Sequence, residues 1–468
     1  MTLPGEGSGE KWRKLTPRLS IRNTCAVTPP DANETYDAVI LGAGPAGSTA
    51  ALTLARRGLR AVVVDRTRFP HFHIGESLLP RNFQLLADLG LSERLAKLPQ
   101  TEKYGADFVT GHGRDGGSIR FADGLVGGSD HAVNLERGPF DKMLLDAARE
   151  AGAEVIEGSA VRGFPRLADG NVAVELDDGR TLAGRWLIDA SGQSTLVGKH
   201  LGLRRVLPHL KKVAYFGHFT NVERSPGIEG GYIRIVMCEE GWFWLIPLDE
   251  ERTSIGLVLE AGRAREAGVV AERMLAWGIE RCPLVARWTE KAESPTNNGI
   301  IADFSYRCAP YAGPGYFLVG DAATFVDPIF STGVCLAMMS AVRAADEVAG
   351  LLAGAKPDAA RRRYVRYVEG SSSAFFRMVD LFYDPAFRDL FISGKGPLQI
   401  HRAIISLLAG EVFPRPAFSV RWRLRLFDLF CFAQRLFPFQ PRRERWSLLS
   451  QSVVGAKGRA QTAVSAPV

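Results

Sequence analysis

Residues 36–66, "YDAVILGAGPAGSTAALTLARRGLRAVVVDR", decide the fold of this chain. The stretch begins with an apolar strand and a glycine turn, continues as a helix rich in Ala and Leu that ends at Gly58, and closes with a second apolar strand ending at Asp65. This order predicts a βαβ unit, and therefore an α/β protein built around parallel strands.

The turn "GAGPAG" fits the pattern G-x-G-x-x-G through Gly42, Gly44 and Gly47, with Ala46 inside it. The first glycine permits a tight turn, the second lets a pyrophosphate approach the backbone, and the third permits close contact between strand and helix. The helix N-terminus attracts the phosphate charge. Asp65, at the end of the next strand, is predicted to accept a ribose hydroxyl.

Composition and charge narrow the class of protein. The 468 residues are 46% hydrophobic and 23% charged, which is typical of a globular protein with a sizeable core. The net charge is +7, but no recognition motif accompanies it, so nucleic acid is not predicted as a partner. The six cysteines lack metal-ligand spacing, so we expect reduced thiols, no metal site and a cytoplasmic protein. Neither a secretory signal nor an apolar run long enough to span a membrane is present.

The pattern changes along the chain and predicts three regions. Residues 1–34 resemble a flexible extension, 35–345 a cofactor-binding core, and 346–468 a helical C-terminal region. Alternating segments such as "YIRIVMCEE" predict an antiparallel substrate sheet inside the core. We assign to that sheet about 101–129 and 201–299, and to the nucleotide part about 35–100, 130–200 and 300–345.

Features farther along the chain resemble those of FAD proteins. "GPGYFLVGDAATFVDP" resembles the second FAD fingerprint, in which Gly320 precedes Asp321 and the aspartate binds the ribityl chain. Arg137, followed by Asp141, and Asp189 complete the set found in glutathione-reductase-type FAD proteins of the hydroxylase subgroup. The resemblance implies a Rossmann-like FAD-binding domain. Taken singly, Arg137, Asp141 and Asp189 are more often cap or surface residues.

Two further motifs resemble those of the flavin-dependent halogenases over about residues 35–345. "GWFWLIP" at 241–247 fits W-x-W-x-I-P, and "FVDPIFSTG" at 325–333 fits F-x-x-P-x-x-S-x-G. The resemblance implies an oxidoreductase that uses FADH2 from a separate flavin reductase, together with O2 and chloride or bromide, to form hypohalous acid. The expected substrate is an electron-rich aromatic compound of secondary metabolism, such as antibiotic biosynthesis.

The resemblance also implies roles for individual residues. The amides of Thr332 and Gly333 bind halide, and Lys103 holds the halogen or donates a hydrogen bond to it. Trp242 and Trp244 separate the flavin from the substrate. Lys97, Lys211 and Lys212 are weaker alternatives to Lys103, the two tryptophans can also be core residues, and Ser331 and Thr332 can also be a helix N-cap. The remaining implied residues are catalytic Ser331 and the cofactor-binding Glu76, Ser77, Pro328 and Gly333.

Phe330 stands where tryptophan halogenases carry a glutamate. This difference favours the branch that acts on phenolic or pyrrolic compounds, frequently bound to a carrier protein. Residues 421–445 hold seven arginines and two acidic residues, which indicates a lid, a carrier-docking surface or, less favoured, a membrane contact. The competing interpretations are a related FAD monooxygenase or geranylgeranyl-reductase-like enzyme, and a non-catalytic flavin-bound scaffold.

Overall fold

The structure is a computed structural model that describes residues 35–455 except 127, 294, 303, 304, 393 and 395, together with the backbone of 460 and 461. The expected extension, residues 1–34, lies outside the described residues. The core and the C-terminal region belong to the same compact unit, which begins at Thr35. The boundary predicted at 345 therefore falls inside a single packed body.

The predicted βαβ unit is present as β1 (Tyr36–Leu41), α1 (Pro45–Ala55) and β2 (Ala61–Asp65). Strand β1 lies parallel to β2 on one side and to β10 (Thr181–Asp189) on the other. The strand order of this sheet is β18-β19-β10-β1-β2-β7, and its outer strands come from distant segments. These are β7 (Glu154–Glu157), β18 (Ala312–Gly313) and β19 (Tyr316–Leu318), with β8 (Val161–Ala168) and β9 (Asn171–Leu176) extending β10 in antiparallel pairing.

Helices cover the nucleotide sheet and bury its apolar residues. Helix α1 packs against α4 (Arg137–Glu150) and α9 (Gly333–Leu352), and its small residues Ala46, Ala50 and Ala51 are almost fully buried there. Small side chains allow helix and sheet backbones to approach closely, which is what the glycine turn requires. Shorter helices lie nearby: α2 (Pro80–Asp88), α3 (Ser92–Leu95) and α5 (Leu196–His200).

The second sheet has the strand order β16-β12-β15-β14-β13-β4-β5. It is antiparallel apart from one pair, because β13 lies parallel to β4, so the predicted antiparallel sheet is in fact mixed. Its strands are β4 (Gly105–Thr110), β5 (Gly116–Arg120), β12 (Lys212–Thr220), β13 (Ile233–Met237), β14 (Gly241–Pro247), β15 (Arg252–Glu260) and β16 (Thr296–Ala302).

Strand β14 places alternate residues on opposite faces of this sheet. Phe243 and Leu245 pack in an apolar cluster with α7 (Met274–Arg281) and α8 (Pro283–Trp288), near α6 (Ala261–Glu266). Trp242 and Trp244 belong to a different cluster, which they share with the C-terminal helices. The two tryptophans therefore face the interior between the second sheet and the C-terminal region.

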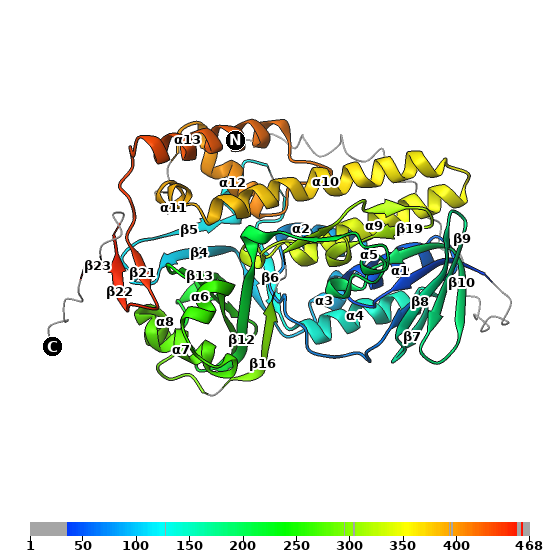
Figure 1. The fold of residues 1–468 in the computed structure, drawn as a ribbon, viewed down its shortest axis with the longest axis horizontal. Coiled ribbons are helices and arrows are strands. Elements are labelled where there is room, and N and C mark those ends of the chain that lie inside the picture. The colour runs from blue at the N-terminus through cyan, green and yellow to red at the C-terminus, as the bar shows by residue number, and fades with distance from the viewer. Residues whose placement is uncertain are drawn as a thin grey trace, which may run out of the picture. The chain divides into compact units, whose positions relative to one another are not determined.

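The C-terminal region contains α10 (Pro357–Phe382), α11 (Pro385–Ile392), α12 (Ile400–Leu408) and α13 (Phe418–Leu436), which are drawn in yellow to orange in Figure 1. These helices contribute buried side chains to the apolar cluster that contains the two tryptophans, among them Phe375, Phe387 and Phe427. The sequence predicted a helical region, but the region also contains strands. It ends in a small sheet of β21 (Arg445–Ser447), β22 (Ser452–Val454) and β23 (Ala460–Gln461).

Two further small sheets carry residues of interest. Strand β3 (Gln100–Lys103) pairs with β6 (Ala132–Leu135), and this pair holds Lys103 opposite Ala132. Strand β17 (Tyr306–Cys308) pairs with β11 (Arg204–Val206) and β20 (Thr324–Phe325), which leads into the "FVDPIFSTG" segment.

Candidate functional site

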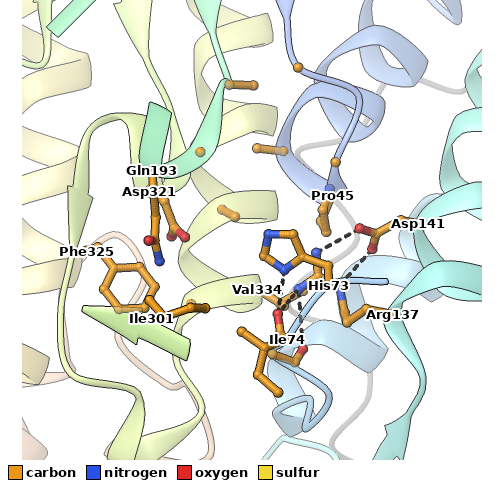
Figure 2. A pocket seen from close by; sticks show the side chains of 18 of the residues that line it. Pro45, His73, Ile74, Arg137, Asp141, Gln193, Ile301, Asp321, Phe325 and Val334 are labelled. Atoms are coloured by element: carbon orange, nitrogen blue, oxygen red, sulfur yellow. Dashed lines mark hydrogen bonds and ion pairs between the residues drawn. The ribbon is translucent and has the colours of Figure 1, made fainter. Parts of the chain in front are cut away.

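A cavity of about 470 Å³ collects most of the predicted site residues. Its walls come from the glycine loop, the Glu76–Ser77 segment, α4, β14 and residues 325–337. In Figure 2, Pro45, His73 and Arg137 lie on one side of this space, and Gln193, Asp321 and Phe325 lie on the other. The walls of the cavity thus come from widely separated parts of the chain.

The three glycines of the loop differ in what surrounds them. Gly42 has a φ of +92°, and a Cβ there would lie 2.4 Å from the carbonyl oxygen of Ala190. A Cβ on Gly47 would lie 1.8 Å from the carbonyl oxygen of Gly42, whereas one on Gly44 would meet nothing within 4 Å. Gly44 lines the cavity, so its open side fits the approach of a cofactor phosphate.

Asp65 both lines the cavity and shapes the loop. Its Oδ2 accepts a hydrogen bond from the backbone N–H of Ala43 (2.7 Å), and its Oδ1 accepts from the N–H and Oγ1 of Thr67 (2.8 and 2.7 Å). The carboxylate therefore fixes the turn and also stands at the cavity wall, where the sequence predicted a ribose contact.

Arg137 and Asp141 form a buried bidentate ion pair with both N–O distances at 2.8 Å. Burial alone would lower the pKa of Arg137, but the Asp141 carboxylate outweighs it and raises that pKa. Asp321 faces this pair across the cavity (Figure 2). Burial raises the pKa of Asp321 to about 7, and Arg137 partly opposes that shift. Arg137, Asp141 and Asp321 all line the cavity.

Asp189, a predicted cofactor-binding residue, does not itself line the cavity. It is fully buried, and its two oxygens accept hydrogen bonds from the backbone N–H groups of Ser191 (3.0 Å) and Val197 (2.8 Å). Because these bonds occupy the carboxylate, Asp189 shapes the turn whose residues Ala190 and Gly192 reach the cavity.

Lys103 is 1% exposed and does not itself line the cavity. Its Nζ donates hydrogen bonds to Ser77 Oγ (2.9 Å), which lines the cavity, and to the carbonyl oxygen of Leu78 (3.1 Å). Burial lowers the pKa of Lys103 to about 7. The amine can therefore be neutral or charged near neutral pH, and no ion pair with a carboxylate holds it charged among the residues that the structure describes.

The alternative lysines have different surroundings. Lys97 and Lys211 are exposed to solvent. Lys212 is buried, but its Nζ pairs with Glu260 Oε1 (3.2 Å) and lies 3.9 Å from the centre of the Tyr383 ring. Of these lysines, only Lys103 bonds to a residue of the cavity wall.

Trp242 and Trp244 line the cavity side by side, with ring centres 5.9 Å apart. The indole N–H of Trp244 donates to Ser254 Oγ (3.1 Å), and Gly256 stands opposite Trp244 on β15. A Cβ on Gly256 would lie 2.1 Å from the Trp244 ring. The neighbouring strand thus leaves room for this ring and fixes its orientation.

The segment predicted to bind halide turns sharply before α9. Ser331 has a φ of +56°, and Thr332 is the N-cap residue but makes no side-chain capping bond. Pro328, Ser331 and Gly333 line the cavity. Because N–H groups at the start of a helix lack intrahelical acceptors, this end presents donors to an anion.

Two polar networks at the site were not identified from the sequence. Glu76 lines the cavity and bonds through Oε1 to His218 Nε2, while His218 Nδ1 lies 3.1 Å from Asn297 Nδ2. Among the described residues, Glu76 Oε2 is buried and has no hydrogen-bond partner. The second network joins Trp242, Tyr383 and Asp327. No local pattern reveals either network, because each joins residues from separate elements.

Comparisons with known proteins agree with this geometry. The FAD binding domain family matches residues 35–372, so the chain belongs to that class of FAD-binding proteins. A 1H-pyrrole-2-carbonyl-(peptidyl-carrier protein) chlorinase of Pseudomonas fluorescens is 28% identical over 83% of this chain and 92% of its own length. A corresponding brominase of Pseudoalteromonas luteoviolacea is 31% identical over 67% of this chain and 77% of its own. The solved structure of the flavin-dependent brominase Bmp2 aligns with a TM-score of 0.75 at 28% identity, covering 85% of this chain and all of that one.

The chain is therefore a member of the flavin-dependent halogenases, and it is an enzyme whose cofactor is FAD and whose co-substrate is a halide. These comparisons do not favour the geranylgeranyl-reductase-like, monooxygenase or scaffold interpretations. In the described part of the chain, no helix has the length and apolar character needed to cross a membrane. The same residues contain no group of three His, Cys, Asp or Glu side chains suited to a metal ion.

Proposed function

We propose that this halogenase transfers chlorine or bromine to an electron-rich aromatic ring through Lys103. The observation that carries the proposal is the buried amine bonded to Ser77 of the cavity wall. The overall reaction consumes FADH2, O2, halide, a proton and an aromatic C–H, and it yields FAD, the carbon–halogen bond and two waters. When bound, the reduced flavin supplies the two electrons that reduce oxygen while the halide is oxidised to hypohalous acid.

Part of the cavity wall supplies groups that would bind the pyrophosphate, a ribose hydroxyl and the ribityl chain of FAD. Gly44 leaves room for the pyrophosphate, and Asp65 stands where a ribose hydroxyl would bind. Asp321 would bind the ribityl chain, and the positive charge of Arg137 partly opposes the rise in the pKa of Asp321. The N–H groups of Thr332 and Gly333 at the start of α9 bind the halide.

Lys103 presents the oxidised halogen to the ring. In its charged form Nζ donates a hydrogen bond to the oxygen of hypohalous acid, which polarises the oxygen–halogen bond. The ring carbon then takes the halogen, and the departing hydroxide combines with the ring proton as water. Since burial brings the pKa of Lys103 to about 7, the charged donor is populated near neutral pH.

Trp242 and Trp244 act as a wall rather than as reacting groups. Their rings line the cavity and are nearly fully buried, so they exclude an organic substrate from the flavin side. Hypohalous acid is small enough to pass such a wall, whereas an aromatic ring is not. This separation favours halogenation over direct oxygen insertion.

We propose a pyrrolic or phenolic substrate, which a carrier protein delivers as a thioester. Two relatives are named for action on a pyrrole bound to a peptidyl-carrier protein, and Phe330 lies where tryptophan halogenases have glutamate. Phe330 is buried against Phe382, so this position offers no carboxylate. A relative named tryptophan 2-halogenase, from Chondromyces crocatus, makes free tryptophan the necessary comparison substrate.

A carrier protein can dock on α13 and the arginines that follow it. The outer face of α13 exposes Phe418, Leu429 and Phe432, each at least 54% exposed. Arg425 is exposed on the same helix, and Arg442 is exposed in the segment that follows it. Carrier proteins are acidic, so this apolar and basic surface suits them. Arg425→Glu with Arg442→Glu is expected to lower kcat/KM for the carrier-bound substrate at least tenfold and to leave the free acid unchanged. Arg265→Glu, an exposed arginine on α6, is the matched control.

The proposed function is tested by supplying photochemically reduced FAD, oxygen and bromide to the purified chain. Pyrrole-2-carboxylate on a carrier, a free phenol and free tryptophan are offered separately. Mass spectrometry should show the bromine isotope pattern on the pyrrole or phenol. Added oxygen without bromine on every probe would contradict the proposal and favour a monooxygenase.

We also propose that a separate flavin reductase supplies FADH2 and that the enzyme acts in the cytoplasm. The cysteines of the described residues are free and buried, which agrees with a reducing compartment. Addition of a flavin reductase with NADH should support the same bromination as chemically reduced FAD.

A further inference from the structure

The C-terminal helices contribute a side chain that joins the two signature motifs. Tyr383 caps α10, and its hydroxyl accepts a hydrogen bond from the indole N–H of Trp242 at 3.0 Å. The same hydroxyl donates to Asp327 Oδ2 at 2.5 Å. The direction is fixed by chemistry, because an indole N–H only donates and an ionised carboxylate only accepts. Tyr383 therefore links the motif "GWFWLIP" to the motif "FVDPIFSTG" through two hydrogen bonds.

Asp327 connects this link to the halide segment. Its Oδ1 accepts from the backbone N–H of Ile329 (3.1 Å) and so holds the turn that leads to Ser331. Asp327 is fully buried, and burial raises its pKa to about 6, while Tyr383 and Lys212 lower it. Lys212 in turn pairs with Glu260. The aspartate thus fixes the loop with one oxygen and the tryptophan wall, through Tyr383, with the other.

A second contact fixes the same end of α10. The ring of Phe382 packs edge-on against Phe330, with ring centres 5.9 Å apart, and also against the Tyr383 ring at 5.4 Å. Neither Tyr383 nor Asp327 lines the cavity, whereas Trp242, Pro328 and Ser331 do. Tyr383 therefore lies behind the wall and acts on the site only through residues that form it.

We propose that Tyr383 is a positioning residue whose hydroxyl fixes Trp242 relative to the halide-binding segment, so that hypohalous acid is contained until it reaches Lys103. This inference rests on the proposed function and extends it, because it assigns to the C-terminal helices a part in containing the oxidant. Without the hydroxyl, the Trp242 ring loses its only side-chain hydrogen bond among the described residues and can rotate away from the loop.

Tyr383→Phe tests the proposal because it removes the hydroxyl and keeps the ring contacts with Phe382 and Lys212. The ratio of brominated product to FADH2 consumed is expected to fall at least threefold, with hydrogen peroxide or free hypobromous acid rising to match. Asp327→Asn, which keeps Tyr383, should give a similar loss, and the double variant should lose no more than either single one. Tyr364→Phe is the control, because it removes a buried tyrosine hydrogen bond to the carbonyl oxygen of Leu318, in a different apolar cluster from Trp242 and Phe330.

A measurement on flavin-free protein separates this inference from the function itself. In a ¹⁵N-tryptophan NMR spectrum, the Trp242 indole signal, assigned with Trp242→Phe, should shift in Tyr383→Phe and stay in place in Tyr364→Phe. An unmoved signal, or an unchanged product ratio, would overturn the role of Tyr383. If the wild-type enzyme brominates nothing while the signal shifts, the hydrogen-bond link stands, but its role in containing the oxidant fails together with the proposed function.

Discussion

Two parts of the site are held together by different kinds of contact. The glycine end comprises the loop Gly42–Gly47 and Asp65, and the tryptophan end comprises Trp242, Trp244 and Lys103. At the glycine end, the loop bonds to itself and to the adjacent strand, as Asp65 does with Ala43 and Thr67. At the tryptophan end, Lys103 bonds to Ser77, and Trp242 bonds to Asp327 through Tyr383. The first end is thus organised by short spacings and the second by tertiary packing. Substitutions at the two ends should therefore fail in different ways.

The largest effect is expected for Lys103→Met, which keeps an apolar stem and removes the amine. Halogenation should fall about 10³-fold because the hydrogen-bond donor to hypohalous acid is lost. FADH2 oxidation should continue, because the residues at the glycine end are untouched. Product by mass spectrometry and flavin oxidation by absorbance give the two rates, with Lys97→Met as the exposed control. Equal loss of both rates would remove the distinction between the two ends.

The next effect separates two glycines of one loop. Gly47→Ala is expected to destabilise the protein by about 3 kcal/mol, because the new methyl group would meet the Gly42 carbonyl oxygen at 1.8 Å. Gly44→Ala should leave the melting temperature unchanged and weaken FAD binding about tenfold, since its methyl group would enter the cavity. Thermal unfolding and FAD titration measure both. A reversed pattern would show that Gly44, rather than Gly47, carries the strand–helix contact.

The pH dependence of stability tests the buried amine. Since burial lowers the pKa of Lys103 to about 7, the unfolded chain binds more protons than the folded one between pH 7 and 10.5. The contribution of Lys103 to the free energy of unfolding therefore rises as the pH rises through that window, and it is lost as the pH falls through it. Lys103→Met should remove a slope of about 1.4 kcal/mol per pH unit, seen by denaturant unfolding between pH 8 and 10. Parallel curves for the two proteins would place the amine in a water-like environment.

The smallest effect is expected for Ser254→Ala, which removes the acceptor of the Trp244 indole N–H. The loss should be about 1 kcal/mol in the free energy of unfolding. Product yield should change less than in Tyr383→Phe, because Gly256 still leaves the pocket that orients the Trp244 ring. A larger loss of product than in Tyr383→Phe would make Trp244, not Trp242, the ring that closes the wall.

Features that depend on neighbouring parts of the chain could be predicted from the sequence, whereas those that depend on distant parts could not. The βαβ unit and the cavity position of Asp65 follow from spacing, because strand, turn and helix are neighbours in the chain. Asp189 shows the limit of a motif, since its carboxylate is used by two backbone N–H groups that no pattern announces. The parallel pairing of β13 with β4 could not be read either, because the partner strand lies more than a hundred residues away.

The tryptophan end was predictable only through the family resemblance. The motifs located Trp242 and Ser331, and the resemblance pointed to Lys103, whose burial agrees with the chemistry proposed for it. Tyr383 and His218 carry no motif, since a tyrosine at a helix end and a histidine in an apolar strand are common. Their importance depends on which side chains tertiary folding brings within hydrogen-bonding distance.

Halogenation by the proposed route requires an oxidised halogen that stays inside the protein until it reaches the ring. The most direct test offers the aromatic substrate and monochlorodimedone, a scavenger of free hypohalous acid, in one reaction with reduced FAD, oxygen and bromide. The wild-type enzyme is expected to brominate its substrate and leave the scavenger nearly untouched, whereas Trp242→Ala should shift bromine to the scavenger. Equal bromination of the scavenger by the wild-type enzyme and Trp242→Ala would contradict this expectation.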